Sequence, residues 1–471
     1  MSNKYLRLIS DSLIFAIGNF LAKLIQYFLL PFYTSNLTTQ VYGTSELLNN
    51  LSEILLPIMT FAIYEAVFRF SINNEYNLAA LLYESISFLF KILIGSFIIA
   101  AAVQYFTHYD YTYNLLILIF ASSFRTLFAN YARGSGHSKC FAASGIVNAL
   151  ALALFSWLFL SRFQWNVRGY LWAITIAHII SSIVLFYGAG INEKIRQRIH
   201  DKQLLPIMLS YSKPLILNNI AWLSISLSNR YIVLFIYGAS TAGIYTAASK
   251  LPAIISVISL IFQQAWQLNS SREYQKEGVA SFFENVWKLY STIIILFGAC
   301  IIGATPLLAN FTLKKEFIVA KQYIPLMMVS VIINCLAAYF NSLLIAFKQT
   351  QAIRNGMMLG AAINLLLSVF LIKPFGIWGI LFGNIICFLV LLIHRIYYVE
   401  KIKTINLELQ ANIPLLLLLF IQAGLASCNY YDISIIISIL MIIFCIFYYR
   451  RQFRKLTPLL STMFQEFFKK V

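Results

Sequence analysis

Long apolar stretches, separated by short polar ones, run along the whole of this 471-residue chain. A helix needs roughly 20 apolar residues to cross the hydrocarbon core of a bilayer. Windows of about that length recur between polar, glycine or proline boundaries, and they predict about fourteen transmembrane helices. These windows are residues 8–33, 41–68, 81–106, 112–132, 141–161, 169–188, 207–236, 241–267, 286–308, 322–346, 356–372, 376–394, 411–428 and 433–449.

The composition agrees with this pattern. Hydrophobic residues make up 60% of the chain and charged residues 11%, whereas about a quarter of the residues in soluble domains are charged. We therefore predict an all-α integral membrane protein. The net charge of +18 is spread over short loops and forms no continuous stripe, so nucleic acid is not expected as a partner.

The loop charges predict an orientation, because loops rich in Lys and Arg stay in the cytoplasm. Both termini are expected inside, and the basic, phenylalanine-containing tail over residues 450–471 is expected to lie on the cytoplasmic membrane surface. With this orientation, the opposite side holds few of the 35 basic residues, namely Arg162, Arg168, Lys314, Lys315, Lys321 and Lys373.

The two halves of the chain resemble each other in short matches. Each match pairs a position in the first half with one in the second half, in the same order and at a nearly constant separation. Six predicted spans separate the copies, so both halves have the same membrane orientation, as in transporters with parallel repeats. The matches pair Ser12 with Ser212, Asn19 with Asn219, Val41-Tyr42 with Ile244-Tyr245, Gly145 with Gly360, and Asn148 with Asn364. The predicted organisation is a six-span N-lobe (1–190), a cytoplasmic inter-lobe loop (191–204), a six-span C-lobe (205–400), two extra spans (401–449) and the basic tail (450–471).

Polar residues recur at helical spacing on the first and seventh predicted spans. Residues three, four or seven positions apart share one face of a helix. The polar positions are Ser12, Asn19, Lys23 and Gln26 on span 1, and Ser212, Asn219, Ser226 and Arg230 on span 7. Two such stripes on repeat-related helices predict a water-filled cavity between the lobes.

Ionisable residues inside spans are costly and commonly functional. Glu46 and Glu53 lie seven residues apart on span 2 and are candidates for coupling or gating. The C-lobe spans contribute only cations, Lys213, Arg230 and Lys250, which together with Lys23 favour an anionic substrate such as a diphosphate. The competing interpretation is that these groups snorkel to the interface or pair with one another.

No motif indicates catalysis or a cofactor. The chain contains no Walker loop, GxGxxG or HExxH motif, its five histidines are isolated, and its six cysteines form no close pair. We therefore expect no cofactor, no metal and no enzymatic activity.

Several short motifs occur together, in order, over most of the chain. They are Tyr42-Gly43, Leu56-Pro57-Ile58, Glu65-Ala66 before Arg69, Arg133-Gly134 with Gly136 and Lys139, Gly243-Ile244-Tyr245 with Lys250-Leu251, and Asn364 followed by Pro374-Phe375-Gly376-Ile377-Trp378-Gly379. In these the sequence resembles the bacterial polysaccharide-transport family, the O-antigen and capsule repeat-unit flippases of the multidrug/oligosaccharidyl-lipid/polysaccharide exporter superfamily.

The resemblance implies two six-helix lobes in the cytoplasmic membrane that alternate between inward-open and outward-open states. It implies transport of an undecaprenyl-diphosphate-linked oligosaccharide to the outer leaflet for surface polysaccharide synthesis, with polysaccharide polymerase machinery as a candidate partner. Helices 1, 2, 7 and 8 would line the cavity. In one departure, Asn229 precedes Arg230 where many relatives have an acidic residue, so a carboxylate there cannot carry a coupling ion.

Three alternatives stay open at this stage. A lipid-linked peptidoglycan precursor flippase is poorly separated from the first interpretation by sequence alone. An ion-coupled multidrug or metabolite exporter of the same superfamily would prefer acidic groups in the C-lobe for cationic drugs. A membrane enzyme such as an oligosaccharide polymerase has similar hydropathy, but such enzymes usually present a large outer loop.

Overall fold

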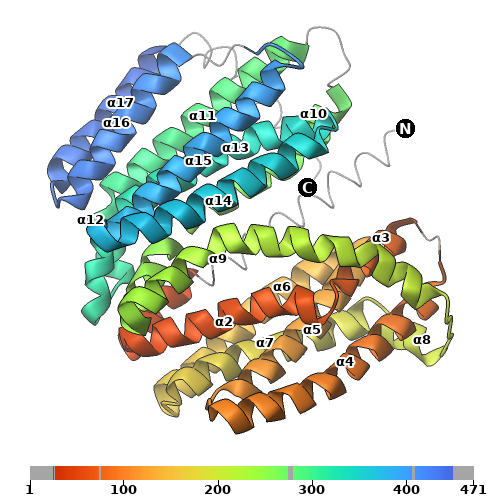
Figure 1. Cartoon of the computed structure of the whole chain (residues 1–471). Helices are drawn as coiled ribbons and strands as arrows, with labels where there is room; N and C mark the ends of the chain where they lie inside the picture. The colour runs from red at the N-terminus through yellow and green to blue at the C-terminus, as the bar shows by residue number, and fades with distance from the viewer. Residues whose placement is uncertain (1–24, 26, 74–75, 274–278, 406–408, 449–471) are drawn as a thin grey trace, which may run out of the picture. The chain divides into compact units, whose positions relative to one another are not determined.

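The computed structural model describes residues 25, 27–73, 76–273, 279–405 and 409–448, and within these ranges it is built of helices without a β-strand (Figure 1). The predicted all-α membrane fold is confirmed. The helices are residues 27–36, α2 (Thr39–Met59), α3 (Ile63–Asn73), α4 (Leu78–Thr107), α5 (Thr112–Gly134), α6 (Ser138–Ser156), η1 (Trp157–Arg162), α7 (Asn166–Gly188), α8 (Ile191–Arg196), α9 (Leu204–Lys250), α10 (Ala253–Glu273), α11 (Val279–Gly303), α12 (Thr305–Thr312), η2 (Lys315–Tyr323), α13 (Ile324–Ala346), α14 (Thr350–Phe375), α15 (Ile377–Glu400), α16 (Leu409–Ser427) and α17 (Tyr431–Tyr448).

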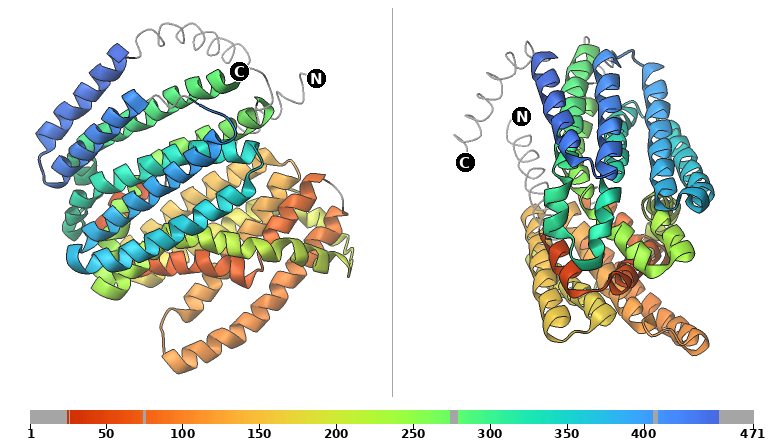
Figure 2. Two further views of the ribbon diagram at one scale, coloured as in Figure 1. Left: turned by 45° about the horizontal axis from the view of Figure 1, so that its top comes forward. Right: turned by 90° about the vertical axis from the view of Figure 1, so that its left-hand side faces the viewer.

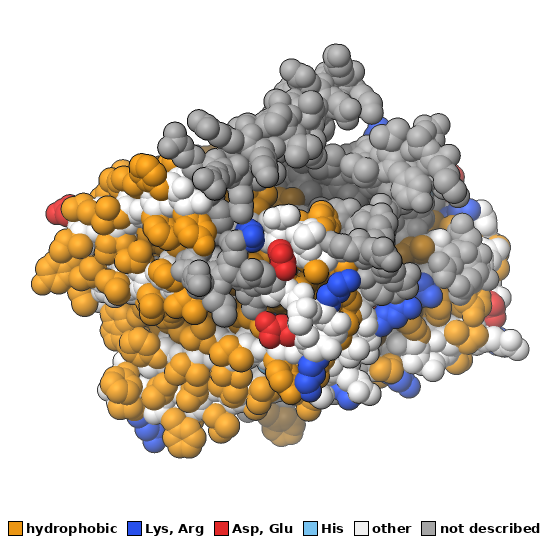
Figure 3. Space-filling model, turned by 90° about the horizontal axis from the view of Figure 1, so that it is seen from above, with side chains coloured by type: hydrophobic (Ala, Val, Ile, Leu, Met, Phe, Trp, Pro, Cys, Tyr) orange, Lys and Arg blue, Asp and Glu red, His pale blue; other side chains and the backbone are white. Residues whose placement is uncertain are grey.

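The protein is a multi-pass membrane protein. Among the described residues, ten helices are long and apolar enough to cross a bilayer, or eleven if α2 and α3 form one bent span. Apolar side chains cover most of the described surface drawn in Figure 3, as lipid contact requires. The first predicted span, 8–33, lies largely outside the described residues, so the count of fourteen and the orientation stay predictions.

The second predicted span, 41–68, is not one straight helix. It is divided between α2 and α3, which meet at an angle of 65°, and the connection places Phe61 and Ala62 at φ of 50° and 48°. Pro57 lies inside α2, two residues before its end, and has no N–H to donate to the carbonyl of Glu53 one turn earlier, which weakens the last turn before the break. Broken spans are common at transporter binding sites.

The seventh predicted span, 207–236, and the first part of the eighth, 241–267, are joined in one long helical segment, and the rest of the eighth belongs to α10. α9 continues to Lys250, and its only non-helical residue is Gly238, at φ 83° and ψ 176°. This conformation suits glycine, and it falls between the predicted windows 207–236 and 241–267. The helix then stops at Leu251-Pro252, before α10, because Pro252 again lacks the N–H that would continue it.

One compact unit, called the first unit here, comprises residues up to Leu251 together with Phe311–Ala320 and Arg354–Cys387. Helices α4 and α5 form a hairpin in it (orange in Figure 2). Its apolar core joins α3, α4, α5 and α7 to the start of α9 and contains the fully buried Ile63, Leu81, Leu127, Leu185 and Met208. Helices α2 and α9 pack along each other in the same unit (Figure 1).

The second unit comprises Pro252–Asn310, Lys321–Ile353 and the described residues from Phe388 onward. Its centre is α13, which packs against α10, α11 and α16. Tyr339 of α13 lies against Trp266, with ring centroids 5.0 Å apart, and Tyr290 donates to the Cys335 carbonyl at 2.9 Å. Gln422 of α16 donates to the carbonyl of Ala299 at 2.9 Å.

These two units do not coincide with the predicted lobes 1–190 and 205–400. The lobes were inferred from repeats, whereas the units reflect packing in this one arrangement, in which α9 of the predicted C-lobe packs on α2 of the N-lobe. The lobe boundaries therefore stay a prediction.

Candidate functional site

Two glycines allow α2 and α9 to cross at backbone contact. A Cβ atom on Gly43 would overlap the carbonyl oxygen of Ala239, and one on Gly243 would overlap the carbonyl oxygen of Thr39. The Thr39 and Ser240 hydroxyls hydrogen-bond across the crossing at 2.7 Å. Small residues four apart on both helices are the usual means of close helix packing in membranes. The contact is reciprocal, because each glycine faces the backbone of the other helix.

Beyond this crossing, the Glu46 carboxylate of α2 collects three donors. Its Oε1 accepts from Lys250 Nζ of α9 at 2.8 Å, from Tyr170 of α7 at 2.8 Å and from Tyr42 at 3.2 Å. Glu46 is 3% exposed, whereas Lys250 keeps about a third of its side chain accessible. A buried carboxylate requires such partners, so this arrangement fixes α2, α7 and α9 around one charge.

Arg230 of α9 lies next to this ion pair. Its Nη1 donates to Asn50 Oδ1 of α2 at 3.0 Å and its Nη2 to the Ser249 hydroxyl at 3.4 Å. Both partners are neutral, and the guanidinium is only partly buried. Glu46 is close enough to act on it electrostatically. Arg230 therefore presents donor groups that can turn to an anionic ligand.

The residue before Arg230 belongs to an amide network. Asn229 donates to Asn384 at 2.7 Å and to Asn364 at 3.4 Å, and it accepts from the Ser368 hydroxyl at 2.9 Å. Asn384 in turn donates to the Tyr245 hydroxyl at 3.4 Å. This network binds α14 and α15 to α9 without a carboxylate, and it holds the helical turn from which Arg230 projects.

Comparison with models of protein families shows which family the chain belongs to. The model of the Polysacc_synt family, polysaccharide biosynthesis protein, matches residues 8–267, more than half of the chain. The chain belongs to this family. A search of curated protein sequences finds no match.

Solved structures of MOP superfamily transporters share the fold of this family member. The Lipid II flippase MurJ in an inward closed conformation gives a TM-score of 0.70 at 11% identity, covering 94% of this chain and all of that one. A multidrug resistance MATE family transporter, inward-facing, gives 0.64 at 12% identity, with 82% and 95% covered. A MOP superfamily transporter from Pyrococcus furiosus Vc1 (DSM3638), whose reverse polarity of the binding pocket suggests a different function, gives 0.58 at 13%, with 83% and 96% covered.

The structure brings some of the predicted site residues together. Glu46 and Lys250 form an ion pair, and Arg230 lies next to them. Glu53 is exposed on α2 and accepts from Asn49 at 3.5 Å. The charge of Lys250, a candidate contact for an anionic substrate, is therefore balanced by Glu46, and sequence spacing alone did not indicate which groups would pair.

Other predicted residues lie elsewhere. Asn219 donates to the Tyr64 hydroxyl at 3.2 Å, and Lys213 is exposed near the start of α9. Asn19 and Lys23 lie outside the described residues, as does the side chain of Ser226.

Sequence reasoning missed several members of the site. The spacing of Asn50 could have indicated its role, because it is four residues after Glu46 and shares its helix face. The glycine crossing also had a signal, since Gly43 and Gly243 each lie next to a Tyr42 or Ile244-Tyr245 repeat match. Tyr170 had none, because a tyrosine in an apolar span is usually a packing residue. Among the described residues, no group of three His, Cys, Asp or Glu side chains is placed to hold a metal ion.

Proposed function

We propose that the protein is a flippase that moves undecaprenyl-diphosphate-linked oligosaccharide repeat units from the inner to the outer leaflet of the bacterial cytoplasmic membrane. The product would serve surface polysaccharide synthesis, as O-antigen, capsule or exopolysaccharide. Membership of the polysaccharide biosynthesis family supports this proposal, as does the fold shared with MOP superfamily transporters.

The observation that carries the proposal is the charge arrangement on α2 and α9. Two cations, Arg230 and Lys250, lie around the buried carboxylate of Glu46, whereas the second acid of α2, Glu53, is exposed. Arg230 is held only by neutral partners in the hydrogen bonds described. A guanidinium presents two parallel donors, which suits a diphosphate. A cationic drug would be repelled by the same arrangement, so the site favours an anionic head group over the cargo of a cation exporter.

The glycine crossing supports alternating access as the mechanism. Backbone contact through Gly43 and Gly243 involves little side-chain interlocking, and it is supplemented by a hydroxyl pair. We assign the crossing to the closed end of the pathway, which opens when the substrate site turns to the other leaflet.

The test is a substitution series at Arg230, in a strain whose own repeat-unit flippase is deleted, with surface polysaccharide as the readout. Arg230→Lys should retain part of the transport, because it keeps the charge but loses the fork; Arg230→Gln should retain much less, and Arg230→Glu essentially none. Lys373→Gln, which removes an exposed cation of α14, is the matched control and should transport normally.

Normal surface polysaccharide from a well-expressed Arg230→Gln variant would refute the diphosphate contact. The same series in proteoliposomes separates the proposed substrate from its closest alternative. Purified protein should translocate a polyprenyl-diphosphate-linked oligosaccharide faster than the lipid-linked peptidoglycan precursor. The reverse preference would make it a precursor flippase, the function named for the MurJ structure.

A further inference from the structure

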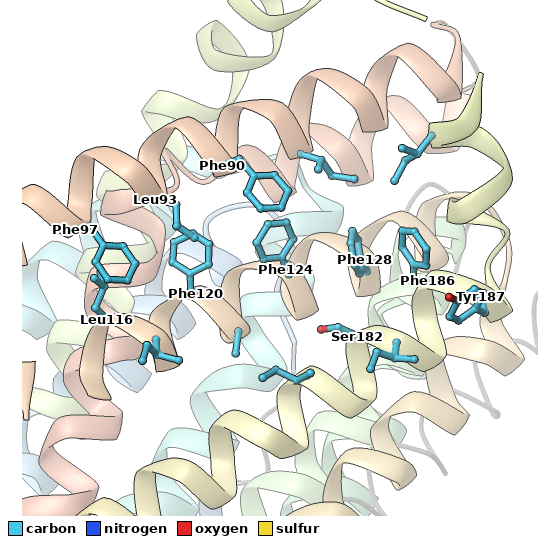
Figure 4. Close-up of a pocket in the computed structure, with 16 residues that line it drawn as sticks. Phe90, Leu93, Phe97, Leu116, Phe120, Phe124, Phe128, Ser182, Phe186 and Tyr187 are labelled. Atoms are coloured by element: carbon cyan, nitrogen blue, oxygen red, sulfur yellow. The ribbon is translucent and has the colours of Figure 1, made fainter. Parts of the chain in front are cut away.

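An apolar groove runs along the first unit, and none of its lining residues belongs to the polar cluster around Glu46. Helices α4 and α7 form its walls and α5 its floor (Figure 4). Its volume is about 740 Å³. Aromatic rings dominate the lining, contributed by Phe90, Phe97, Phe120, Phe124, Phe128 and Phe186.

The shape of the groove suits one hydrocarbon chain. Its floor extends from Leu116 to Phe128 of α5, which at 1.5 Å per residue is about 18 Å. One leaflet of the hydrocarbon core is about 15 Å thick. Phe90 and Ile183 on the walls are each about half exposed, so the groove opens sideways towards the lipid.

One end of the groove meets a basic segment. Ile195 of α8 lines that end, and Lys194 and Arg196 adjoin it in sequence, with Arg198 two residues further on. Glu193 and Asp201 are the acidic residues of this segment, so cations remain in excess. Tyr187, which also lines this end, is largely exposed, as is typical of a tyrosine at the membrane interface.

A buried carboxylate holds the basic segment in place. Glu84 of α4 contacts the His200 ring at Nδ1 and accepts from the Asp201 backbone N–H at 3.1 Å. Glu84 is 5% exposed and lies two residues before Ile86, another groove residue. The segment is therefore anchored directly to the helix that forms one wall.

We propose that this groove binds one anionic phospholipid, with an acyl chain along the phenylalanines and the head group on Lys194, Arg196 and Arg198. The predicted orientation places this end in the cytoplasmic leaflet. The length of the groove favours a phospholipid over the tail of a polyprenyl carrier, because the groove matches one leaflet and an undecaprenyl chain is much longer. The site is separate from the transported substrate and does not depend on its identity.

The test measures lipid retention. The protein is reconstituted with equal amounts of phosphatidylglycerol and phosphatidylethanolamine, extracted into detergent, and its retained lipids are counted by mass spectrometry. The wild type should retain phosphatidylglycerol preferentially. Each basic residue near an anionic membrane surface is worth about fivefold in binding, so Lys194→Gln with Arg196→Gln should reduce the preference about 25-fold. The matched control, Lys401→Gln with Lys403→Gln, should leave it unchanged.

Filling the groove provides an independent arm. Ser182→Phe should displace the acyl chain and remove the retained phosphatidylglycerol, and Ile179→Trp repeats the test at an exposed wall position. Leu154→Trp, at an exposed apolar position of α6 outside the groove, should have no effect. Size-exclusion profiles and melting curves identify any variant that fails to fold.

Several outcomes would overturn the assignment. They are a wild-type protein without preference for phosphatidylglycerol, an equal loss in the Lys401 and Lys403 control, and unchanged retention in both folded groove-filling variants. Displacement of phosphatidylglycerol by an equimolar amount of undecaprenyl phosphate would instead assign the groove to a carrier tail and reject the phospholipid.

Discussion

At the scale of single residues, the Glu46–Lys250 ion pair links α2 and α9 at 2.8 Å. Removing one partner leaves the other without its counter-charge, which is costly in a buried setting. Tyr170 and Tyr42 can still donate to the carboxylate in a Lys250 variant. The stability lost on replacing Glu46 should therefore depend strongly on whether Lys250 is present, and the two single replacements should differ in their cost.

A double-mutant cycle checks this coupling. Because Lys250 is partly exposed, Glu46→Gln should destabilise the protein by about 1–3 kcal/mol, less than a fully buried pair. Combining it with Lys250→Met should cost clearly less than the sum of the two single changes, as measured by denaturant titration in detergent micelles. Glu193→Gln, an exposed acid on α8, should change stability by less than about 0.5 kcal/mol. Simple additivity of the two changes would show that the pair is not coupled.

The second prediction at this scale concerns Glu53. Its exposed carboxylate lies on α2 one turn before Pro57, which gives no N–H to the Glu53 carbonyl, and the bend between α2 and α3 follows two turns later. Carboxylate and freed carbonyl oxygens at broken spans are typical cation and proton sites. Glu53→Gln should therefore weaken or abolish the dependence of transport on the pH or sodium gradient, while Glu53→Asp should preserve it in part. Transport by Glu53→Gln that equals the wild type under every gradient would exclude coupling through this residue.

At the scale of elements, the α2–α9 crossing predicts that replacing glycine by alanine has opposite effects inside the crossing and outside it. Alanine normally stabilises a helix relative to glycine by about 1 kcal/mol, and Gly95→Ala and Gly424→Ala should be neutral or stabilising, because a Cβ there meets no atom within 4 Å. Gly43→Ala or Gly243→Ala should instead push the helices apart and disfavour this closed arrangement.

Disulfide trapping measures that shift. In a cysteine-free background, Thr39→Cys with Ser240→Cys joins the two helices at their hydroxyl contact. Adding Gly43→Ala should lower the cross-linking rate several-fold, whereas adding Gly95→Ala should not. Equal rates for both would mean that the glycine contact does not control closure.

At the scale of the whole molecule, the loop charges predict the orientation. Cysteine labelling in intact cells should find the segment from Lys194 to Lys202 protected, since basic loops resist translocation. Lys314-Lys315 should be accessible, although this pair opposes the charge rule locally, because the bias of the whole chain sets the orientation. External labelling of the first segment would reverse the topology. It would also move the proposed phospholipid to the outer leaflet.

The apolar pattern by itself determined that this is an all-α membrane protein, because each span must satisfy its backbone hydrogen bonds within its own sequence. It also placed Arg230, Glu46 and Lys250 on helices that the structure packs together. Only the tertiary structure decided which groups meet, such as Glu46 with Tyr170 and Lys250. Lipid-facing and protein-facing positions are equally apolar in a membrane, so the sequence pattern carries little information on which helix faces come together, and contacts between residues far apart in the chain appear only once the helices are packed.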